Sequence, residues 1–526
     1  MNFLFAPAAT QRRRLVVTTG RPFWRSVELY PPQADIFLLD SALTDGRLGR
    51  WSFAGGQPQA ALVGRRNPDA NGGLNLELTV WREPDGSAPA QPRFLAFAGD
   101  PYEALRTLRA AYRPEEKDLA ACGADGAPFG GGLVGWFGYG TAWAAEHLPW
   151  RIDRPESDAP DLLFLVFDDV LRHDHSTGET TLALIGRGPD EQAAAFDLET
   201  RTDAWNLRLR RFADTAAPVE TATAGGATDG GAPSCAVPPD LSGVTAGCDE
   251  AAYRAAVARC REHILAGDAF EICLTQQLVA PLRAEPWELY RALREINPAP
   301  FSAFVRTGGL AVAGASPERF LSLDAGGHLE SRPIKGTRPR GASPAEDQRL
   351  RDELRNSEKD GAENVMIVDL VRSDLGRVAR VGSVTTPELK GIETYATVHQ
   401  MVSTIRADLR PDRDALDAVK ACFPGGSMTG APKLEAMAII DALEPAPRGI
   451  YAGALGWLGY DGAMDLSIVI RTFVCTGGTV TFGVGGAVTA DSEPGAEYRE
   501  TLDKARALLA ALQSSTPLST GEGGHS

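Results

Sequence analysis

One segment that cannot form a core divides this 526-residue chain. Residues 216–247 are rich in alanine, glycine, threonine and proline and contain few large apolar side chains. Such a segment buries too little apolar surface to offset the entropy lost on ordering, so we predict a flexible linker there. The same composition predicts a disordered tail over residues 514–526. The rest is too long for one ordinary core, and we expect an N-terminal lobe at 1–215 and a second domain at 248–513.

The composition excludes several classes of protein. The formal net charge of −16 argues against a general nucleic-acid binder. No apolar run is long enough to span a bilayer, and the N-terminal charges follow a very short apolar piece, the wrong order for a secretory signal. The seven cysteines include no Cys-x-x-Cys pair, so neither a zinc site nor a disulfide framework is indicated. We expect a cytoplasmic protein that acts on neither nucleic acid nor membranes.

Apolar patterning predicts a mixture of strands and helices in both parts of the chain. Before the linker, Leu162–Phe167 reads as a buried strand, with Thr180–Ile185 as its expected partner. After the linker, we predict helices at 250–266, at 356–378 and from Pro494, and strands at 270–279, 311–323 and 398–409.

One lysine of the second domain has an unusual sequence environment. Lys335 stands between a Pro-Ile pair and a glycine, and Arg332, Arg338 and Arg340 are close by in the sequence. A lysine among other cations in a partly apolar setting has its charged form disfavoured and becomes a better nucleophile. The alternative interpretation is a basic surface turn.

A loop of small residues, 424–433, precedes an expected helix. Free backbone N–H groups and the macrodipole at such a helix start favour an anion. The loop lacks the Gly-Lys-Ser/Thr ending of a P-loop, and the alternative is a tight loop with an ordinary cap. Together with Lys335, the cations Lys433, Arg471 and Lys504 would let an acidic protein bind an anionic substrate.

Several carboxylates are candidates for chemistry. On the helix expected from Pro494, Glu497, Glu500 and Lys504 fall within a sector of about 60°. Two or three carboxylates that converge, with Glu363 from another helix, would suit Mg²⁺. The alternative is a Glu500–Lys504 surface pair. Two candidate acid–base groups are Glu318 and His399, although a histidine in an apolar strand is more often structural.

These segments, in this order, resemble the chorismate-utilising enzymes, especially component I of aminodeoxychorismate synthase and of anthranilate synthase. The resemblance covers most of the chain. It implies an α+β fold with two central packed β-sheets flanked by helices and a site between the sheets. The runs that carry it are Ser316-Pro-Glu-Arg-Phe, Arg332-Pro-Ile-Lys-Gly-Thr, Glu363-Asn-Val-Met-Ile-Val-Asp-Leu, Gly430-Ala-Pro-Lys, Ile470-Arg-Thr, and Asp491-Ser492 through Lys504.

The residue at position 335 distinguishes members of this family. Anthranilate synthases have an alanine there, whereas aminodeoxychorismate synthases have a lysine, as this chain does. The resemblance implies that Lys335 attacks C2 of chorismate, the 4-hydroxyl leaves, and ammonia enters at C4 as the lysine departs. Water-using relatives, the isochorismate and salicylate synthases, carry a lysine base where this chain has Glu271, which counts against them. Many relatives have glutamine there, so the role of Glu271 is open.

The resemblance also assigns roles to individual residues. It implies Mg²⁺ at Glu363 and Glu500 with Glu497 close by, and acid–base chemistry at Glu318 and His399. Ala487 replaces a usual glycine, but its backbone N–H can still bind a carboxylate. The implied substrate contacts are Thr429, Gly430, Tyr451, Arg471, Gly485, Ala487 and Lys504.

The N-terminal lobe resembles the tryptophan pocket of anthranilate synthases. The implied pocket consists of Ser41, Pro300, Phe301 and Ser302. Asp40 stands where those enzymes carry glutamate, which disfavours feedback by tryptophan but leaves a structural tryptophan open.

Nothing in the sequence resembles a glutamine amidotransferase or a pyruvate-removing lyase. We therefore expect an enzyme that makes 4-amino-4-deoxychorismate from chorismate and ammonia, the ammonia coming from a separate glutamine amidotransferase subunit. Two alternatives are an anthranilate synthase component I and a non-catalytic subunit that binds chorismate or tryptophan.

Overall fold

The computed structural model describes residues 8–18, 20–43, 48–67, 73–120, 126–146, 157–214, 241–395 and 398–515. Most of the predicted linker and nearly all of the predicted tail lie outside these residues. The end of the linker region is described, and Thr245–Ala246 forms a short strand there, β11, that pairs with β12 (Glu271–Pro281).

The part of the chain before the linker is mainly β-structure. Its elements are β1 (Ala9–Val17), the 3-10 helix η1 (Phe23–Leu29), β2 (Ile36–Asp40), β3 (Trp51–Gly56), β4 (Ala60–Arg66), β5 (Leu74–Val80), β6 (Arg93–Gly99), α1 (Pro101–Tyr112), α2 (Glu116–Ala120), β7 (Gly132–Phe137), α3 (Thr141–Glu146), β8 (Leu162–Phe167), β9 (Val170–Asp174), β10 (Glu179–Gly188) and α4 (Glu191–Asp214).

The part after the linker mixes helices and strands. After β11, its elements are α5 (Glu250–Ala266), β12, α6 (Pro286–Ile296), β13 (Phe301–Thr307), β14 (Leu310–Ser316), β15 (Arg319–Leu323), β16 (His328–Ser331), β17 (Ile334–Pro339), α7 (Pro344–Arg355), α8 (Glu358–Gly376), β18 (Thr385–Thr394), β19 (Val398–Asp408), α9 (Ala415–Cys422), the 3-10 helix η2 (Gly426–Met428), β20 (Gly430–Ala431), α10 (Lys433–Leu443), β21 (Ala454–Gly459), β22 (Met464–Ile468), β23 (Thr472–Thr476), β24 (Thr479–Val488) and α11 (Pro494–Ser514).

The strands form two 12-stranded sheets. The first has the order β1-β10-β9-β3-β2-β13-β14-β23-β24-β12-β11, with β20 also paired to β12. The second has the order β17-β19-β16-β15-β22-β21-β7-β8-β4-β5-β6, with β18 also paired to β19. Each sheet takes strands from both sides of the linker, because β2 pairs with β13 in the first sheet and β7 pairs with β21 in the second. The predicted boundary at the linker thus divides the sequence, but each sheet contains strands from before and after it.

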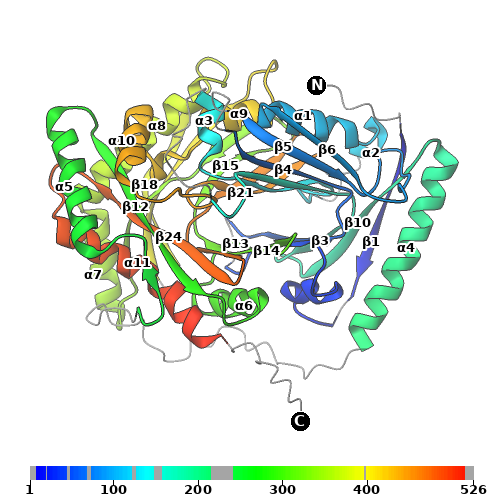
Figure 1. Cartoon of the computed structure of the whole chain (residues 1–526), viewed down its shortest axis with the longest axis horizontal. Helices are drawn as coiled ribbons and strands as arrows, with labels where there is room; N and C mark the ends of the chain where they lie inside the picture. Colours follow the sequence, from blue (N-terminus) through cyan, green and yellow to red (C-terminus); the bar gives the residue numbers. More distant parts are fainter. Residues whose placement is uncertain are drawn as a thin grey trace, which may run out of the picture.

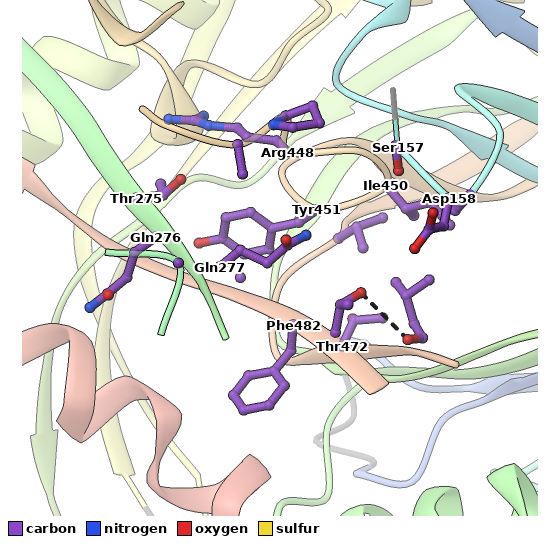
Figure 2. A pocket seen from close by; sticks show the side chains of 18 of the residues that line it. Ser157, Asp158, Thr275, Gln276, Gln277, Arg448, Ile450, Tyr451, Thr472 and Phe482 are labelled. Atoms are coloured by element: carbon purple, nitrogen blue, oxygen red, sulfur yellow. Dashed lines mark hydrogen bonds between the residues drawn. The ribbon is translucent and has the colours of Figure 1, made fainter. Parts of the chain in front are cut away.

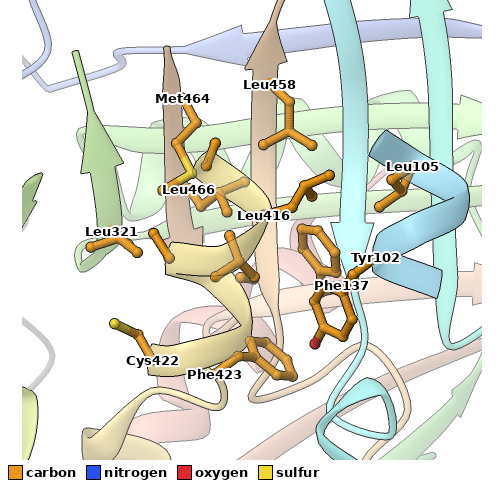
Figure 3. Close-up of a cluster of buried hydrophobic side chains, with 14 of the residues drawn as sticks. Tyr102, Leu105, Phe137, Leu321, Leu416, Cys422, Phe423, Leu458, Met464 and Leu466 are labelled. Atoms are coloured by element: carbon orange, nitrogen blue, oxygen red, sulfur yellow. The ribbon is translucent and has the colours of Figure 1, made fainter. Parts of the chain in front are cut away.

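Apolar side chains fill the space between the sheets and cover their outer faces. The inter-sheet core includes Trp136 and Leu165 from the second sheet and Val305 and Val312 from the first. The outer face of the second sheet packs against α1 and α9 (Figure 3). Helices α5, α7, α8, α10 and α11 gather at one end of the molecule, and α4 lies at the other (Figure 1). The predicted fold class, two packed sheets flanked by helices, is confirmed.

Two strand predictions were wrong for the same reason: the chain crosses between the two sheets at turns that the predictions did not include. Residues 311–323 form two strands, β14 in the first sheet and β15 in the second, separated by Pro317 and Glu318. Similarly, the chain leaves the second sheet after β8 and enters the first at β9, so β8 and β10 are not partners. Within the described residues, no helix combines the length and apolarity needed to cross a membrane.

Candidate active site

Two crossings between the sheets bring Glu318 and Arg471 together. One joins β14 to β15 through Glu318, and the other joins β22 to β23 through Arg471. The Ile468 N–H donates to the Glu318 carbonyl at 3.0 Å, and the Ala315 N–H donates to the Arg471 carbonyl at 3.1 Å. Arg471 has a left-handed backbone conformation, with φ of 50°, which is uncommon for a side-chain-bearing residue. The fold therefore fixes a carboxyl and a guanidinium side by side between the sheets.

Burial changes the ionisation of both groups. Burial raises the pKa of Glu318 to about 7, against the opposing effects of Ser427 and Lys335, so the carboxyl remains a proton donor near neutral pH. Burial also lowers the pKa of Arg471, and Glu318 opposes this shift. Among the described residues, no side-chain hydrogen bond or ion pair occupies the Arg471 guanidinium. This guanidinium is therefore available for a ligand carboxylate.

Lys335 and Glu271 form a buried ion pair across the two sheets. Lys335 lies on β17, an edge strand of the second sheet, and Glu271 begins β12 of the first. The lysine Nζ donates to Glu271 Oε1, while Glu271 Oε2 is buried without a hydrogen-bond partner among the described residues. Burial lowers the pKa of Lys335, but Glu271 and Glu363 outweigh burial and raise it above its ordinary value.

The predicted reason for the reactivity of Lys335 was therefore wrong. The charges of the nearby arginines are balanced by carboxylates, and none of the arginines is among the groups that shift the pKa of Lys335. Arg332 pairs with Glu393, Arg338 Nε lies 2.8 Å from Glu353 Oε1, and Arg340 Nε lies 2.7 Å from Asp347 Oδ1. The lysine is held as an ammonium by carboxylates.

The three predicted metal carboxylates lie on two helices. Glu363 of α8 is 3.8 Å from the ammonium of Lys359, whose charge also acts on Glu497 and Glu500 of α11. Burial raises the pKa of Glu363 to about 7, and burial also raises the pKa of Glu497. Burial acts in the same direction on Glu500, but Lys504 outweighs it and lowers that pKa. The arrangement is an acidic cluster balanced by two lysines.

This cluster fits a magnesium ion in part. Ser492 Oγ donates to Glu497 Oε1 at 2.6 Å, but Glu497 Oε2 is buried without a hydrogen-bond partner among the described residues. An orphaned carboxylate oxygen suits a hard cation. In the described part of the chain, no three histidine, cysteine or acidic side chains are close enough to form a complete ligand set. Mg²⁺ commonly uses one or two protein carboxylates together with water and substrate, and Glu497 and Glu500, which lie together over Gly486, meet that requirement.

The glycine-rich strand β24 runs beneath this cluster. A Cβ on Gly486 would lie 3.3 Å from both Glu497 Oε2 and Glu500 Oε1, so the two carboxylates cover the backbone there. Lys504 Nζ donates to the Gly485 carbonyl at 2.9 Å and lies 2.8 Å from Glu500 Oε1. Ala487 is on the same strand, opposite Cys273 of β12. The predicted substrate-binding residues of β24, Gly485 and Ala487, are thus neighbours of Lys504 on α11.

The loop before α10 differs in part from its predicted role. Lys433 is buried and donates to Asp374 Oδ2 at 2.6 Å and to the Cys422 carbonyl at 2.8 Å, so it holds the loop rather than a ligand. Thr429 is fully buried, and its carbonyl accepts from Cys273 N–H at 2.8 Å. A Cβ on Gly430 would lie 2.0 Å from the Glu271 carbonyl, so this position requires glycine.

A cavity of about 190 Å³ adjoins Tyr451 (Figure 2). The tyrosine ring lies against Gly483 of β24, and Thr275 and Gln276 of the neighbouring strand β12 also line the cavity. Arg448 closes one wall, and its guanidinium is bound by Glu444 at 2.7 Å. No motif or spacing in the sequence pointed to this cavity or to the Arg448–Glu444 pair.

His399 is bound on both sides by its own chain. It is fully buried on β19, with Nδ1 2.9 Å from Thr394 Oγ1 and Nε2 3.0 Å from Asp347 Oδ1. An acid–base role for His399 requires one of these hydrogen bonds to be exchanged for a bond to substrate.

The predicted tryptophan pocket brings together distant parts of the chain. Ser41 Oγ donates to the Trp51 carbonyl at 2.8 Å and lies 3.4 Å from the Pro300 carbonyl. The neighbouring Asp40 accepts from Tyr290 and Arg294. Arg319 lies over the Phe301 ring, and Ser302 is buried. The polar groups described here are satisfied within the chain.

The sequence matches known proteins along nearly its whole length. It is 41% identical to aminodeoxychorismate synthase of Streptomyces griseus over 519 residues, covering 97% of this chain and 66% of that protein. It is 40% identical to anthranilate synthase component 1 of Streptomyces coelicolor over 495 residues, covering 94% of this chain and 86% of that protein. It is 36% identical to aminodeoxychorismate synthase component 1 of Bacillus subtilis over 480 residues, covering 90% of this chain and 91% of that protein. The chain therefore spans just under two thirds of the S. griseus protein and most of the other two.

The fold also matches a solved structure. Anthranilate synthase component I from Streptococcus pneumoniae superposes with a TM-score of 0.67 at 27% identity, covering 88% of this chain and 92% of that one. A family model for chorismate binding enzymes matches residues 87–510, a range that includes Glu271, Glu318, Lys335 and the acidic cluster. The chain belongs to the family of chorismate binding enzymes.

Proposed function

We propose that this protein converts chorismate and ammonia to 4-amino-4-deoxychorismate. The observation that carries the proposal is Lys335, a buried amine between the two sheets where anthranilate synthases are expected to have alanine. Relatives named aminodeoxychorismate synthase, at 36% to 41% identity over most of the chain, support the same conclusion.

The site offers a separate group for each requirement of this reaction. Lys335 would attack C2 of the ring, and Glu318 would give a proton to the departing 4-hydroxyl. Arg471 and the backbone of Gly485 and Ala487 would bind the substrate's carboxylates. Ammonia would then bond to C4 while the lysine nitrogen leaves C2. The proposed product keeps its enolpyruvyl group.

Product analysis tests the proposal. Purified protein with chorismate, ammonium and magnesium should form an aminated product without pyruvate release. Mass spectrometry and a pyruvate assay on the same reaction check this. Fluorescent anthranilate with one pyruvate per turnover would instead identify the protein as an anthranilate synthase, and recovery of unchanged chorismate would favour a non-catalytic binding subunit.

We further propose that Glu363, Glu497 and Glu500 hold magnesium. When bound, the ion would neutralise a substrate carboxylate and draw it towards α8 and α11. Glu497 and Glu500 contribute oxygens over Gly486 that repel an anion until a cation balances them. Lys359 and Lys504 supply part of that balance in the ion-free protein.

Glu363→Gln and Glu500→Gln should each leave the protein folded but remove most magnesium-dependent turnover. Since Mg²⁺ relies on one or two protein carboxylates, loss of one ligand should raise the magnesium needed for half-maximal rate by about 10-fold or more. Titration of activity against magnesium measures this. Glu358→Gln, an exposed carboxylate of the same helix α8, is the matched control. Unchanged magnesium dependence in both variants would remove these residues from the metal site.

Turnover should fall as the pH rises through about 7 if Glu318 is the acid for the leaving hydroxyl. Burial raises its pKa, so the protonated form is present below this pH and is lost above it. Glu363 has a similarly raised pKa, so the pH–rate profile of the wild type alone does not show which carboxyl causes its falling limb. Glu318→Gln should remove the limb and lower kcat by about 100-fold or more. A limb that persists in Glu318→Gln belongs to another group.

We also propose that ammonia comes from a separate glutamine amidotransferase subunit and that the protein works in the cytoplasm. Relatives named component 1 support a two-subunit enzyme. The cysteines in the described residues, which are all free, fit a reducing compartment.

A further inference from the structure

The proposed nucleophile is held in its unreactive form. An ammonium has no lone pair, so Lys335 must lose a proton before its nitrogen can bond to C2. The carboxylates around it oppose that loss, since Glu271 and Glu363 stabilise the positive charge. The reaction therefore needs a group that takes this proton at the moment of attack.

Glu271 is the group in position to do so. Among the described residues it is the only carboxylate within ion-pair distance of Lys335 Nζ, and the two are directly hydrogen-bonded. Its side chain is fully buried, and Oε2 has no hydrogen-bond partner among the described residues. One oxygen thus faces the lysine while the other has unused acceptor capacity.

The surroundings hold this pair in a fixed position. Glu271 pairs with Ala431 of β20 on one side of β12, and the Gly430 backbone packs against its carbonyl. The other titratable groups that act on Lys335 or feel its charge are Glu363 from α8, Cys273 from β12, Glu318 from the crossing between sheets, and Glu500 from α11. Among the described residues, none of these four contacts the lysine nitrogen as Glu271 does.

We propose that Glu271 is the proton acceptor for Lys335, taking a proton as the lysine attacks C2 and returning it after the lysine leaves. This inference rests on the proposed function. Glu271 receives one proton from Nζ; the neutral amine then bonds to C2, the ring double bonds shift, and the C4–O bond breaks. The hydroxyl departs as water with a proton from Glu318. Ammonia next bonds to C4, the double bonds shift back, and the Nζ–C2 bond breaks to release neutral lysine. The new C4 ammonium returns a proton to Glu318, and Glu271 returns its proton to Lys335, so both acids are reset.

Glu271→Gln separates this role from a purely electrostatic one, because the two predict opposite results. Glutamine cannot accept the proton, so kcat should fall by about 100-fold if Glu271 is the acceptor. If Glu271 only holds the lysine charged, its removal lowers the pKa of Lys335, and the variant should be as fast as wild type or faster, with its pH profile displaced to lower pH. That second result would overturn the proposal.

Three further measurements keep the test decisive. Glu353→Gln is the matched control, because Glu353 pairs with Arg338 of the same strand as Lys335 and is largely exposed; it should leave kcat unchanged. In Glu271→Ala, added formate should restore part of the lost rate, and a folded variant that formate does not rescue would contradict a proton-accepting role. Product analysis of the wild type is run alongside. If the wild type does not aminate C4, the proposed function is wrong. If the wild type gives the aminated product and Glu271→Gln has an unchanged kcat, only the inference about Glu271 is wrong.

Discussion

Lys335→Ala should lose C4 amination almost completely, with kcat reduced on the order of 1,000-fold or more, since a covalent nucleophile cannot be replaced by its neighbours. Chorismate should still bind, because Arg471 and the acidic cluster are untouched. Slow attack of ammonia at C2 could then give anthranilate-type products. In the wild type, intact-mass analysis during turnover should find a substrate adduct that maps to Lys335. Amination at the wild-type rate by the variant, with no adduct in the wild type, would make Lys335 a binding cation instead.

Two controls distinguish lost chemistry from lost structure. Lys335→Ala leaves Glu271 buried without its partner, and breaking a buried pair in this way costs about 3–5 kcal/mol. Lys335→Arg keeps a cation beside Glu271 but offers no comparable nucleophile, so it should be more stable than the alanine variant and equally inactive. Glu353→Gln, which removes only an exposed carboxylate paired with Arg338 of the same strand, should keep its activity. Urea unfolding of all three variants accompanies the kinetics.

Asp168→Asn should cause a large loss of stability at a position far from the candidate site. Asp168 lies at the crossing from β8 to β9 and is fully buried, and Arg187 of β10 donates to both of its oxygens at 2.7 Å. Tyr460 also donates to it, at 3.0 Å. The amide would leave the Arg187 charge buried without a counterion, at a cost of about 3–5 kcal/mol. The urea midpoint of unfolding measures this loss.

Glu179→Gln is the matched control for this prediction. Glu179 is on the same strand as Arg187 but forms an exposed pair with Arg14, and exposed pairs contribute about 0–1 kcal/mol. Adding Arg187→Met to Asp168→Asn should recover part of the loss, because the uncompensated charge is then gone. Equal midpoints for Asp168→Asn and Glu179→Gln would show that the buried pair contributes no more than an exposed one.

Elements with strong local signals were predicted well from the sequence. The helix expected at 250–266 is α5, with Asp249 capping its start and the left-handed Gly267 at its end. The strand expected at 311–323 is two strands, because the chain crosses between the sheets at Pro317 and Glu318, a polar break that the prediction did not use. Local patterns therefore predicted elements but not the sheet to which each belongs.

The catalytic roles assigned to the site residues stay predictions, but the electrostatics predicted for Lys335 were wrong. The sequence pointed to Lys335, Glu318 and Arg471. It also suggested that nearby arginines would favour a neutral lysine, whereas partners distant in the sequence decide the charge. Glu271 precedes Lys335 by 64 residues, and Glu393 follows Arg332 by 61. Such pairings depend on the way the sheets meet, which residue spacing does not reveal.

The sharing of both sheets between the two ends of the chain has a consequence for biosynthesis. Strand β7 pairs with β21 from Gly132↔Gly459 to Phe137↔Ala454, so this partner leaves the ribosome long after β7 does. Until then β7 and β2 each have one unpaired edge, which is a surface for intermolecular strand pairing. Contacts between residues this far apart in the sequence also slow folding, because the entropy of loop closure is lost before the contact energy is gained. Nascent chains of this protein should therefore depend on chaperones that cover strand edges, and a 248–513 fragment expressed alone should aggregate.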